Sequence, residues 1–291
     1  MRVCVVLALA IGLYSEYHNR YGAFPVQQYG VLTMLLYPSS TNRPVTIDNL
    51  SQLPEPPKLG RFHNPSSFAN FANQIGESLD LHGIQIGESE IVTSNNDMRM
   101  FGAIRLFSLG EDKSFNIVLG FRASYDQSIK RGLCIGSSVL VCSNLCFTGS
   151  LGEWQSKQST NIDLRVITMI DNAIQTLPEV GEREVKRIKD YKETEILPRD
   201  GDGALVHLYR KRALSASQLG TALTQWKNPK YAEHKESGFS AYRLLQSCTQ
   251  AIKPNGATSN PFSVEQKTRT QTKFLDAVVD GGYSRAITAI H

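Results

Sequence analysis

The sequence predicts an α+β protein in which a helix packs on an antiparallel β-meander and a mainly helical C-terminal lobe follows. Three observations support this prediction: an early apolar stripe with helical spacing, a run of strand-like segments divided by short polar turns, and a return to helical spacing after Gly152. With 291 residues, 41% of them hydrophobic and 20% charged, the chain has the composition of a globular protein with a substantial core.

Residues 1–60 are expected to form an N-terminal lead-in, which is rich in proline, serine and threonine from residue 38 onward. The apolar run from Val3 to Tyr14 follows Arg2, as in an export signal, but no small-x-small cleavage motif follows it and it is too short to span a membrane. Three interpretations stay open: a buried N-terminal strand or helix, a start at Met34, or an export signal.

The first helix is expected between Asn64, as the N-cap, and Gly83, as the stop, with Pro65 at the first helical position. Its apolar residues recur three and four apart, so that one helix face is buried. These residues are Phe68, Phe71, Ala72, Ile75 and Leu79.

Strands are expected over 84–94, 98–109, 115–123 and 134–147, with turns at 95–97 and 110–113. The nearly continuous apolar run from Val139 to Leu145 is typical of a strand that is covered on both faces. Together with the preceding helix, these strands define an α+β core over 61–197.

Helical spacing returns at 162–177, and the mixed-charge segment up to residue 195 is expected to continue as a solvent-facing helix. A link at 197–214 then leads into the helical lobe, 198–291. Capping boxes at Ser215-x-x-Gln218 and Ser263-x-x-Gln266 predict two of its helices, and the spacing over 239–252 predicts another.

Charge is unevenly spread along the chain. The net charge is +4, but residues 196–291 carry 13 Lys and Arg against 7 Asp and Glu. A basic lobe suits a phosphate-bearing or acidic partner, and it is equally compatible with a merely solvated surface. The five cysteines form no dense framework, which indicates reduced thiols in a cytoplasmic setting.

No motif predicts catalysis or a cofactor. In Ser124-Tyr125-Asp126 the serine and the aspartate are expected to satisfy backbone donors at a strand end. Cys142 and Asn144 lie in the apolar run and are expected to be buried and structural. The six histidines are scattered and no glycine-rich phosphate loop occurs, so we expect no metal and no cofactor, and a non-enzyme rather than an enzyme.

Nucleic acid is the ligand that the residue pattern favours. On a strand, Arg99, Phe101 and Arg105 share one face with Ala103 and Phe107, and arginine beside aromatic residues on a sheet is typical of single-strand binding. The alternative is that the phenylalanines are core and the arginines lie at its edge. The other candidate contacts are cations: Arg122, Lys130, Arg131, Arg210, Lys211 and Arg212.

The segment Leu119–Gly149 resembles the core of a phage/plasmid-like protein family of unknown function, domain-of-unknown-function family 932. The likeness extends from about Leu50 to Val279 and includes Met100-Phe101-Gly102, Ser124-Tyr125-Asp126, Trp226, Asn228-Pro229 and Thr249–Lys253. Tyr125, Phe239 and Gln250 stand where that family commonly has His, Trp and Glu, so a catalytic role of those positions does not carry over. The resemblance implies a cytoplasmic protein of a phage or another mobile element.

The sequence therefore predicts a phage or mobile-element accessory protein that acts by binding, to DNA, with single-stranded DNA favoured, or to a DNA-handling complex. The alternative is an anti-defence or host-takeover inhibitor that acts by protein–protein contact as a homo-oligomer. Neither hypothesis involves a membrane.

Overall fold

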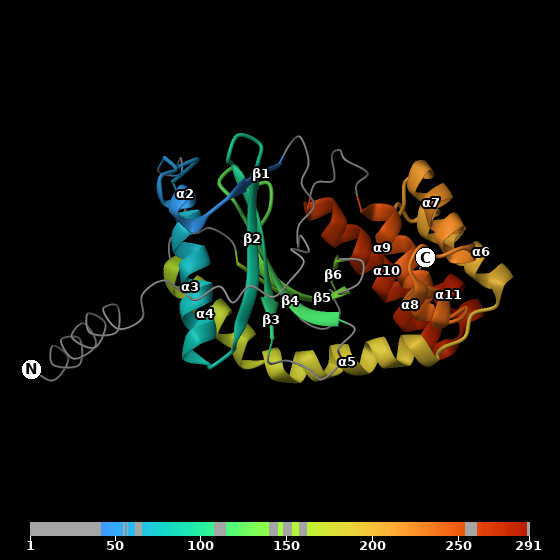
Figure 1. The fold of residues 1–291 in the computed structure, drawn as a ribbon. Helices are drawn as coiled ribbons and strands as arrows, with labels where there is room; N and C mark the ends of the chain where they lie inside the picture. The colour runs from blue at the N-terminus through green and yellow to red at the C-terminus, as the bar shows by residue number, and fades with distance from the viewer. Residues whose placement is uncertain are drawn as a thin grey trace, which may run out of the picture. The chain divides into compact units, whose positions relative to one another are not determined.

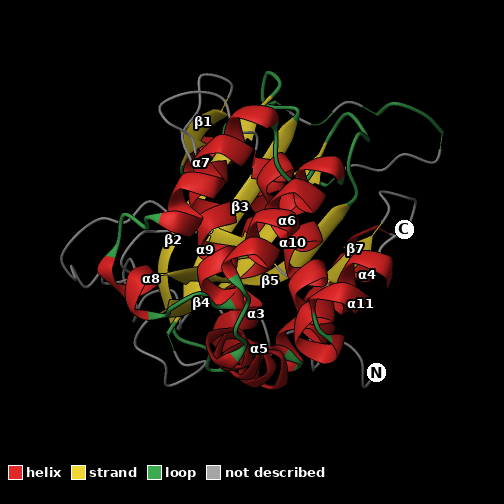
Figure 2. Ribbon diagram, turned by 90° about the vertical axis from the view of Figure 1, so that its right-hand side faces the viewer, coloured by secondary structure: helices red, strands yellow, loops and turns green. Residues whose placement is uncertain are grey.

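The computed structural model describes residues 42–54, 56, 58–61, 66–107, 115–139, 145–147, 153–156, 162–253 and 261–289. They belong to one compact unit of the chain, Thr33–His291. Their fold confirms the predicted α+β class: an antiparallel sheet carries helices, and the C-terminal region is helical (Figures 1 and 2). Several expectations concern residues outside these ranges: the first 41 residues, Asn64, Pro65, the 110–113 turn, Cys142 and Asn144.

The sheet is a meander, as predicted. In the described residues its path runs β1-β2-β3-β4-β5-β6, and β7 pairs with β5 beside β6. The strands are β1 (Asn42–Val45), β2 (Ile86–Ser94), β3 (Arg99–Leu106), β4 (Phe115–Ser124), β5 (Arg131–Val139), β6 (Leu145–Phe147) and β7 (Glu153–Ser156). The turn between β2 and β3 places Asn95, Asn96 and Asp97 at positive φ, a conformation that asparagine and aspartate tolerate best among non-glycine residues.

The lead-in contains regular structure that the sequence analysis did not predict. β1 pairs with β2, and α2 (Ile47–Ser51) begins at Thr46, whose side chain forms a reciprocal capping box with Asn49. The expected first helix is α3 (Phe68–Leu81), which buries the predicted apolar face. Its N-cap is Ser67, and Gly83 at φ +67° ends it as expected.

Two helices follow the sheet. They are α4 (Ile162–Gln175) and α5 (Leu177–Glu193), and Pro178 lies in the first turn of α5. The expectation that α5 faces solvent was only partly right. Its exposed side carries ion pairs such as Lys186–Asp190, but Glu184 and Arg187 are buried and form an ion pair with an Oε1–Nη2 distance of 2.6 Å.

The C-terminal region contains α6 (Pro198–Arg210), α7 (Ala216–Lys227), α8 (Ala232–Glu236), α9 (Ala241–Ile252), α10 (Pro261–Gly281) and α11 (Tyr283–Ala289). The capping box of Ser215 and Gln218 is present at the start of α7. Two expectations were wrong: the predicted link is largely occupied by α6, and α10 begins before Ser263.

Helices cover both faces of the sheet. On one face Phe71 of α3 packs edge-on against Phe121 of β4, with ring centroids 6.2 Å apart. On the other face Arg122 of β4 forms an ion pair with Glu265 of α10. Figure 2 shows the C-terminal helices in front of the strands, and in Figure 1 α3 and α4 lie on the opposite side. Among the described residues, no helix combines the length and the apolar character needed to cross a membrane.

Candidate nucleic-acid interface

The Arg–Phe face of β3 is not open to a ligand. Arg99, Phe101 and Arg105 share one side of the strand, as expected from its two-residue period. However, Phe101 is 1% exposed and Arg105 7% exposed. Figure 2 shows the C-terminal helices in front of the sheet. Arg105 also forms an ion pair with Glu88, with Nη1 and Oε2 3.2 Å apart. The burial of Phe101 confirms the alternative for this residue, which belongs to the core, whereas Phe107 is exposed. This side of β3 is therefore not the open single-strand surface that was also considered.

The other arginines of the sheet also have structural partners. Arg122 pairs with Glu265, as described above. Arg131 points to the opposite face, where its guanidinium lies 4.8 Å from the ring centroid of Phe71 and donates to the Ser66 carbonyl oxygen at 2.8 Å. It is fully buried, whereas its neighbour Lys130 is exposed. Of Arg122, Lys130 and Arg131, only Lys130 is therefore an accessible cation.

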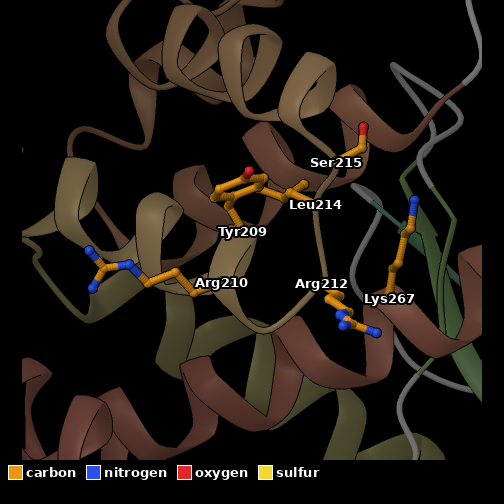
Figure 3. Close-up of a pocket in the computed structure, with 6 residues that line it drawn as sticks. All are labelled: Tyr209, Arg210, Arg212, Leu214, Ser215 and Lys267. Carbon is orange, nitrogen blue, oxygen red and sulfur yellow. The ribbon is translucent and has the colours of Figure 1, made fainter.

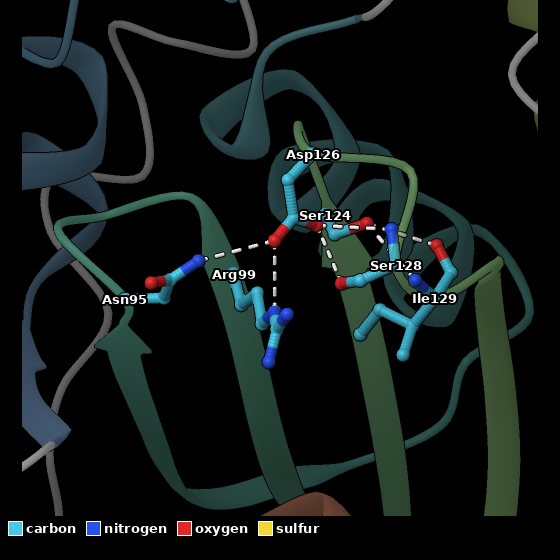
Figure 4. A network of polar contacts seen from close by, with 6 residues as sticks. All are labelled: Asn95, Arg99, Ser124, Asp126, Ser128 and Ile129. Carbon is cyan, nitrogen blue, oxygen red and sulfur yellow. Dashed lines mark hydrogen bonds and ion pairs between the residues drawn. The ribbon is translucent and has the colours of Figure 1, made fainter.

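The Ser124–Asp126 segment has the structural role that the sequence predicted (Figure 4). Ser124 Oγ accepts from the Ile129 backbone N–H at 3.2 Å and donates to the Ile129 carbonyl oxygen at 3.0 Å. Asp126 accepts from the Ser128 backbone N–H at 3.0 Å and from Arg99 Nε at 3.0 Å. Burial alone would raise the pKa of Asp126, but the hydrogen bonds from Ser128 and Arg99 outweigh it and hold the pKa below its ordinary value.

Tyr125, between Ser124 and Asp126, contacts the first residue of α3. Its ring stacks on Phe68 at a centroid distance of 3.7 Å, and its hydroxyl oxygen accepts from the Phe68 backbone N–H at 2.8 Å. Burial raises the pKa of Tyr125, so that the phenol stays neutral near neutral pH. The triplet therefore joins the end of β4 to the start of α3.

Three of the predicted cations lie together at the junction of α6 and α7. The stretch from Gly203 to Ala232 contains no aspartate or glutamate and five Lys or Arg residues. Arg210 and Arg212 are exposed and Lys211 is half-buried, and the structure gives these three no ion pair with another described residue. We call Tyr209, Arg210, Lys211, Arg212, Ser215 and Lys267 the basic corner.

A pocket of about 450 Å³ lies in the basic corner, lined by Tyr209, Arg210, Arg212, Leu214, Ser215 and Lys267 (Figure 3). Lys267 reaches it from α10 and donates to Gln218 Oε1 at 2.9 Å. The Ser215 backbone N–H donates to the same oxygen at 2.9 Å. Burial lowers the pKa of Lys267. The start of α7 and α10 are thereby tied together at one wall of the pocket.

Arg210 connects this pocket to a second one. In Figure 3 its guanidinium points away from Arg212 and Lys267. It also lines a pocket of about 410 Å³ together with Asp202, Gly203, Val206, His207, Tyr283 and Ile287. The acidic residue there, Asp202, lies 3.4 Å from the Lys227 ammonium through its Oδ2 atom. Arg210 is the residue that the two pockets share.

The described residues include no group of three or more His, Cys, Asp or Glu side chains that could hold a metal ion. Among the predicted contacts, the structure brings Arg210, Lys211 and Arg212 together with two residues that sequence reasoning missed, Tyr209 and Lys267. Tyr209 and the absence of acidic residues over 203–232 were readable from the sequence, whereas Lys267 joins through tertiary packing of α10.

Comparison with protein families, with curated proteins and with solved structures finds no match for this chain.

Proposed function

We propose that this protein binds nucleic acid through the basic corner. The observation that carries the proposal is the segment of thirty residues without an acidic side chain, whose cations Arg210 and Arg212 are exposed around a pocket. Phosphate groups are recognised by clustered exposed cations, and the attraction weakens as salt is added.

The remaining parts of the proposal concern the biological setting. We propose an accessory role for a phage or another mobile element, with DNA or a DNA-handling complex as the partner. This part of the proposal rests on the resemblance expected for the Leu119–Gly149 segment, which no family model matches. The binding surface differs from the one expected first, because the sheet arginines hold the fold together rather than face a ligand.

A salt titration of binding tests this proposal. We expect the full chain to bind labelled DNA at low salt, with an affinity that falls linearly with added salt on logarithmic scales. Replacing Arg210, Lys211 and Arg212 with alanine removes three phosphate contacts, so the slope of that line is expected to fall by about 2 for single strands.

The matched control is the triple alanine variant at Arg183, Lys186 and Lys189, which removes the same charge from the exposed side of α5. Those three cations are paired with Glu179, Asp190 and Glu193. We expect the control to bind nearly as the unchanged protein does. Equal losses in the two variants contradict the assignment of binding to the basic corner. No binding of any DNA at low salt contradicts nucleic-acid binding itself and favours protein–protein contact as the mode of action.

A further inference from the structure

Tyr209 is an exposed aromatic residue without a partner among the described side chains. It lies in the last turn of α6, directly before Arg210-Lys211-Arg212, and 42% of it is exposed. Its side chain makes no hydrogen bond or ring contact to another described residue. Phe239, which is similarly exposed at 38%, instead packs against Trp226 and Arg243. The free ring face of Tyr209 is therefore available to a ligand.

The backbone beside Tyr209 is fixed in an unusual conformation. Arg212 has φ +60°, a left-handed conformation that costs a non-glycine residue about 1 kcal/mol and that glycine commonly occupies at a helix end. Two hydrogen bonds hold it: the Arg212 N–H donates to the Tyr209 carbonyl oxygen at 2.9 Å, and the Ala213 N–H donates to the Leu208 carbonyl oxygen at 2.9 Å. These hydrogen bonds fix the backbone that carries the Arg212 side chain beside the pocket.

The ring and the cations lie around one pocket. Figure 3 shows Tyr209 and Leu214 in the middle, with Arg212 and Lys267 on one side and Arg210 on the other. Leu214 is 2% exposed and anchors the wall to the core. Proteins that bind single-stranded nucleic acid combine an aromatic face with flanking cations, because unpaired bases stack on the ring while the phosphates contact the charges.

We propose that Tyr209 stacks on an unpaired base while Arg212 and Lys267 contact the neighbouring phosphates, so that the basic corner selects single-stranded over double-stranded nucleic acid. In a duplex the base faces are already stacked on their neighbours, so only the phosphate contacts are left for the corner. This inference rests on the proposed nucleic-acid binding and specifies its ligand class.

The test compares single- and double-stranded oligonucleotides of one sequence at low salt. Tyr209→Ala is expected to weaken single-strand binding about 5- to 100-fold and to leave duplex binding within about twofold. Tyr209→Phe keeps the ring and is expected to bind normally. Phe107→Ala is the control, because Phe107 is an aromatic residue 51% exposed just after β3 and outside the corner.

A second measurement uses the unchanged protein, so it does not depend on a variant that folds. An oligonucleotide that carries 5-iododeoxyuridine is irradiated in the complex, and the crosslinked peptide is expected to contain Tyr209. Single-strand binding that is unaffected by Tyr209→Ala, or equal losses on both ligands, overturns base stacking while nucleic-acid binding stands. No binding by the unchanged protein overturns the proposed function itself.

Discussion

Arg122 on β4 and Glu265 on α10 form an ion pair across 143 positions of sequence. The Glu265 side chain is 2% exposed and that of Arg122 18% exposed, so the pair lies inside the contact between sheet and helix. Glu265 Oε1 also lies 3.4 Å from Arg269 Nη1 of the next turn. This carboxylate therefore fixes α10 over the sheet face that the sequence analysis expected to be open.

Glu265→Ala is expected to lower the free energy of unfolding by about 3–5 kcal/mol, because it leaves a poorly solvated guanidinium without its carboxylate. The double variant Arg122→Leu/Glu265→Leu is expected to recover part of this loss, since neither charge is then buried. Urea unfolding of the single and double variants measures both values. If the single and double variants are equally destabilised, the loss of unfolding free energy comes from lost packing and not from the unpaired Arg122 charge.

The helical glycines Gly201 and Gly220 are expected to respond oppositely to alanine. A Cβ atom at Gly201 would lie 2.2 Å from the Trp226 ring, whereas at Gly220 it would meet nothing within 4 Å. Gly201→Ala is therefore expected to cost about 1–3 kcal/mol through overpacking. Gly220→Ala is expected to stabilise the protein by up to about 1 kcal/mol, the difference in helix propensity. Thermal unfolding of the two variants measures both effects. A lower melting temperature of Gly220→Ala contradicts the expected stabilisation at that position.

Tyr125→Phe is expected to lower the free energy of unfolding by about 1–2 kcal/mol. The change keeps the stacked ring but removes the oxygen that accepts from the Phe68 N–H, which is then left buried without that acceptor. Hydrogen exchange of the Phe68 amide provides a local measurement, and it is expected to accelerate. Tyr231→Phe serves as the control, because the structure gives the hydroxyl of this half-buried tyrosine no hydrogen bond to another described residue. An unchanged Phe68 exchange rate contradicts this account.

His234 is expected to make stability fall on acidification. Burial, together with the nearby charge of Arg243, lowers the pKa of His234 from 6.5 to about 4. Below pH 6.5 the His234 imidazole is protonated in the unfolded chain, whereas in the folded protein it stays neutral until the pH approaches 4. The stability is therefore fully present above pH 6.5 and is lost as the pH falls toward 4, with a limiting slope of about 1.4 kcal/mol per pH unit.

His234→Gln is expected to remove this component of the pH dependence, as measured by urea unfolding between pH 7 and pH 4.5. An NMR titration of the His234 ring in the folded protein is the direct check. A ring that titrates near pH 6.5 excludes His234 as the source.

The fold was predictable from the sequence where local spacing determines structure. The stripe from Phe68 to Leu79 predicted the buried face of α3, and Ser215 and Gln218 predicted the start of α7 through a capping box that both side chains complete. α6 was missed because Gly201 and Gly203 disfavour a helix locally. The close approach of Trp226 to Gly201 is a tertiary contact that compensates for this cost.

The candidate site could be predicted only in part. The spacing of Arg99, Phe101 and Arg105 correctly placed them on one face of β3, but which helix covers that face depends on contacts between residues far apart in the sequence. Arg122 and Glu265 illustrate this dependence. Three cations of the basic corner, by contrast, follow one another in the chain, so the run Arg210-Lys211-Arg212 was found from sequence alone, whereas Lys267 was not.

The edges of the sheet bear on self-association. Among the described strands, one edge is β1, a strand of four residues that includes Arg43 and Pro44, and proline offers no backbone N–H to an incoming strand. Along the other side β5 is flanked by two short strands, β6 of three residues and β7 of four, rather than by one long strand. Short, charged or interrupted edges are poor templates for intermolecular strand addition. We therefore expect the described edges of the sheet to be poor sites for strand addition between copies of the chain.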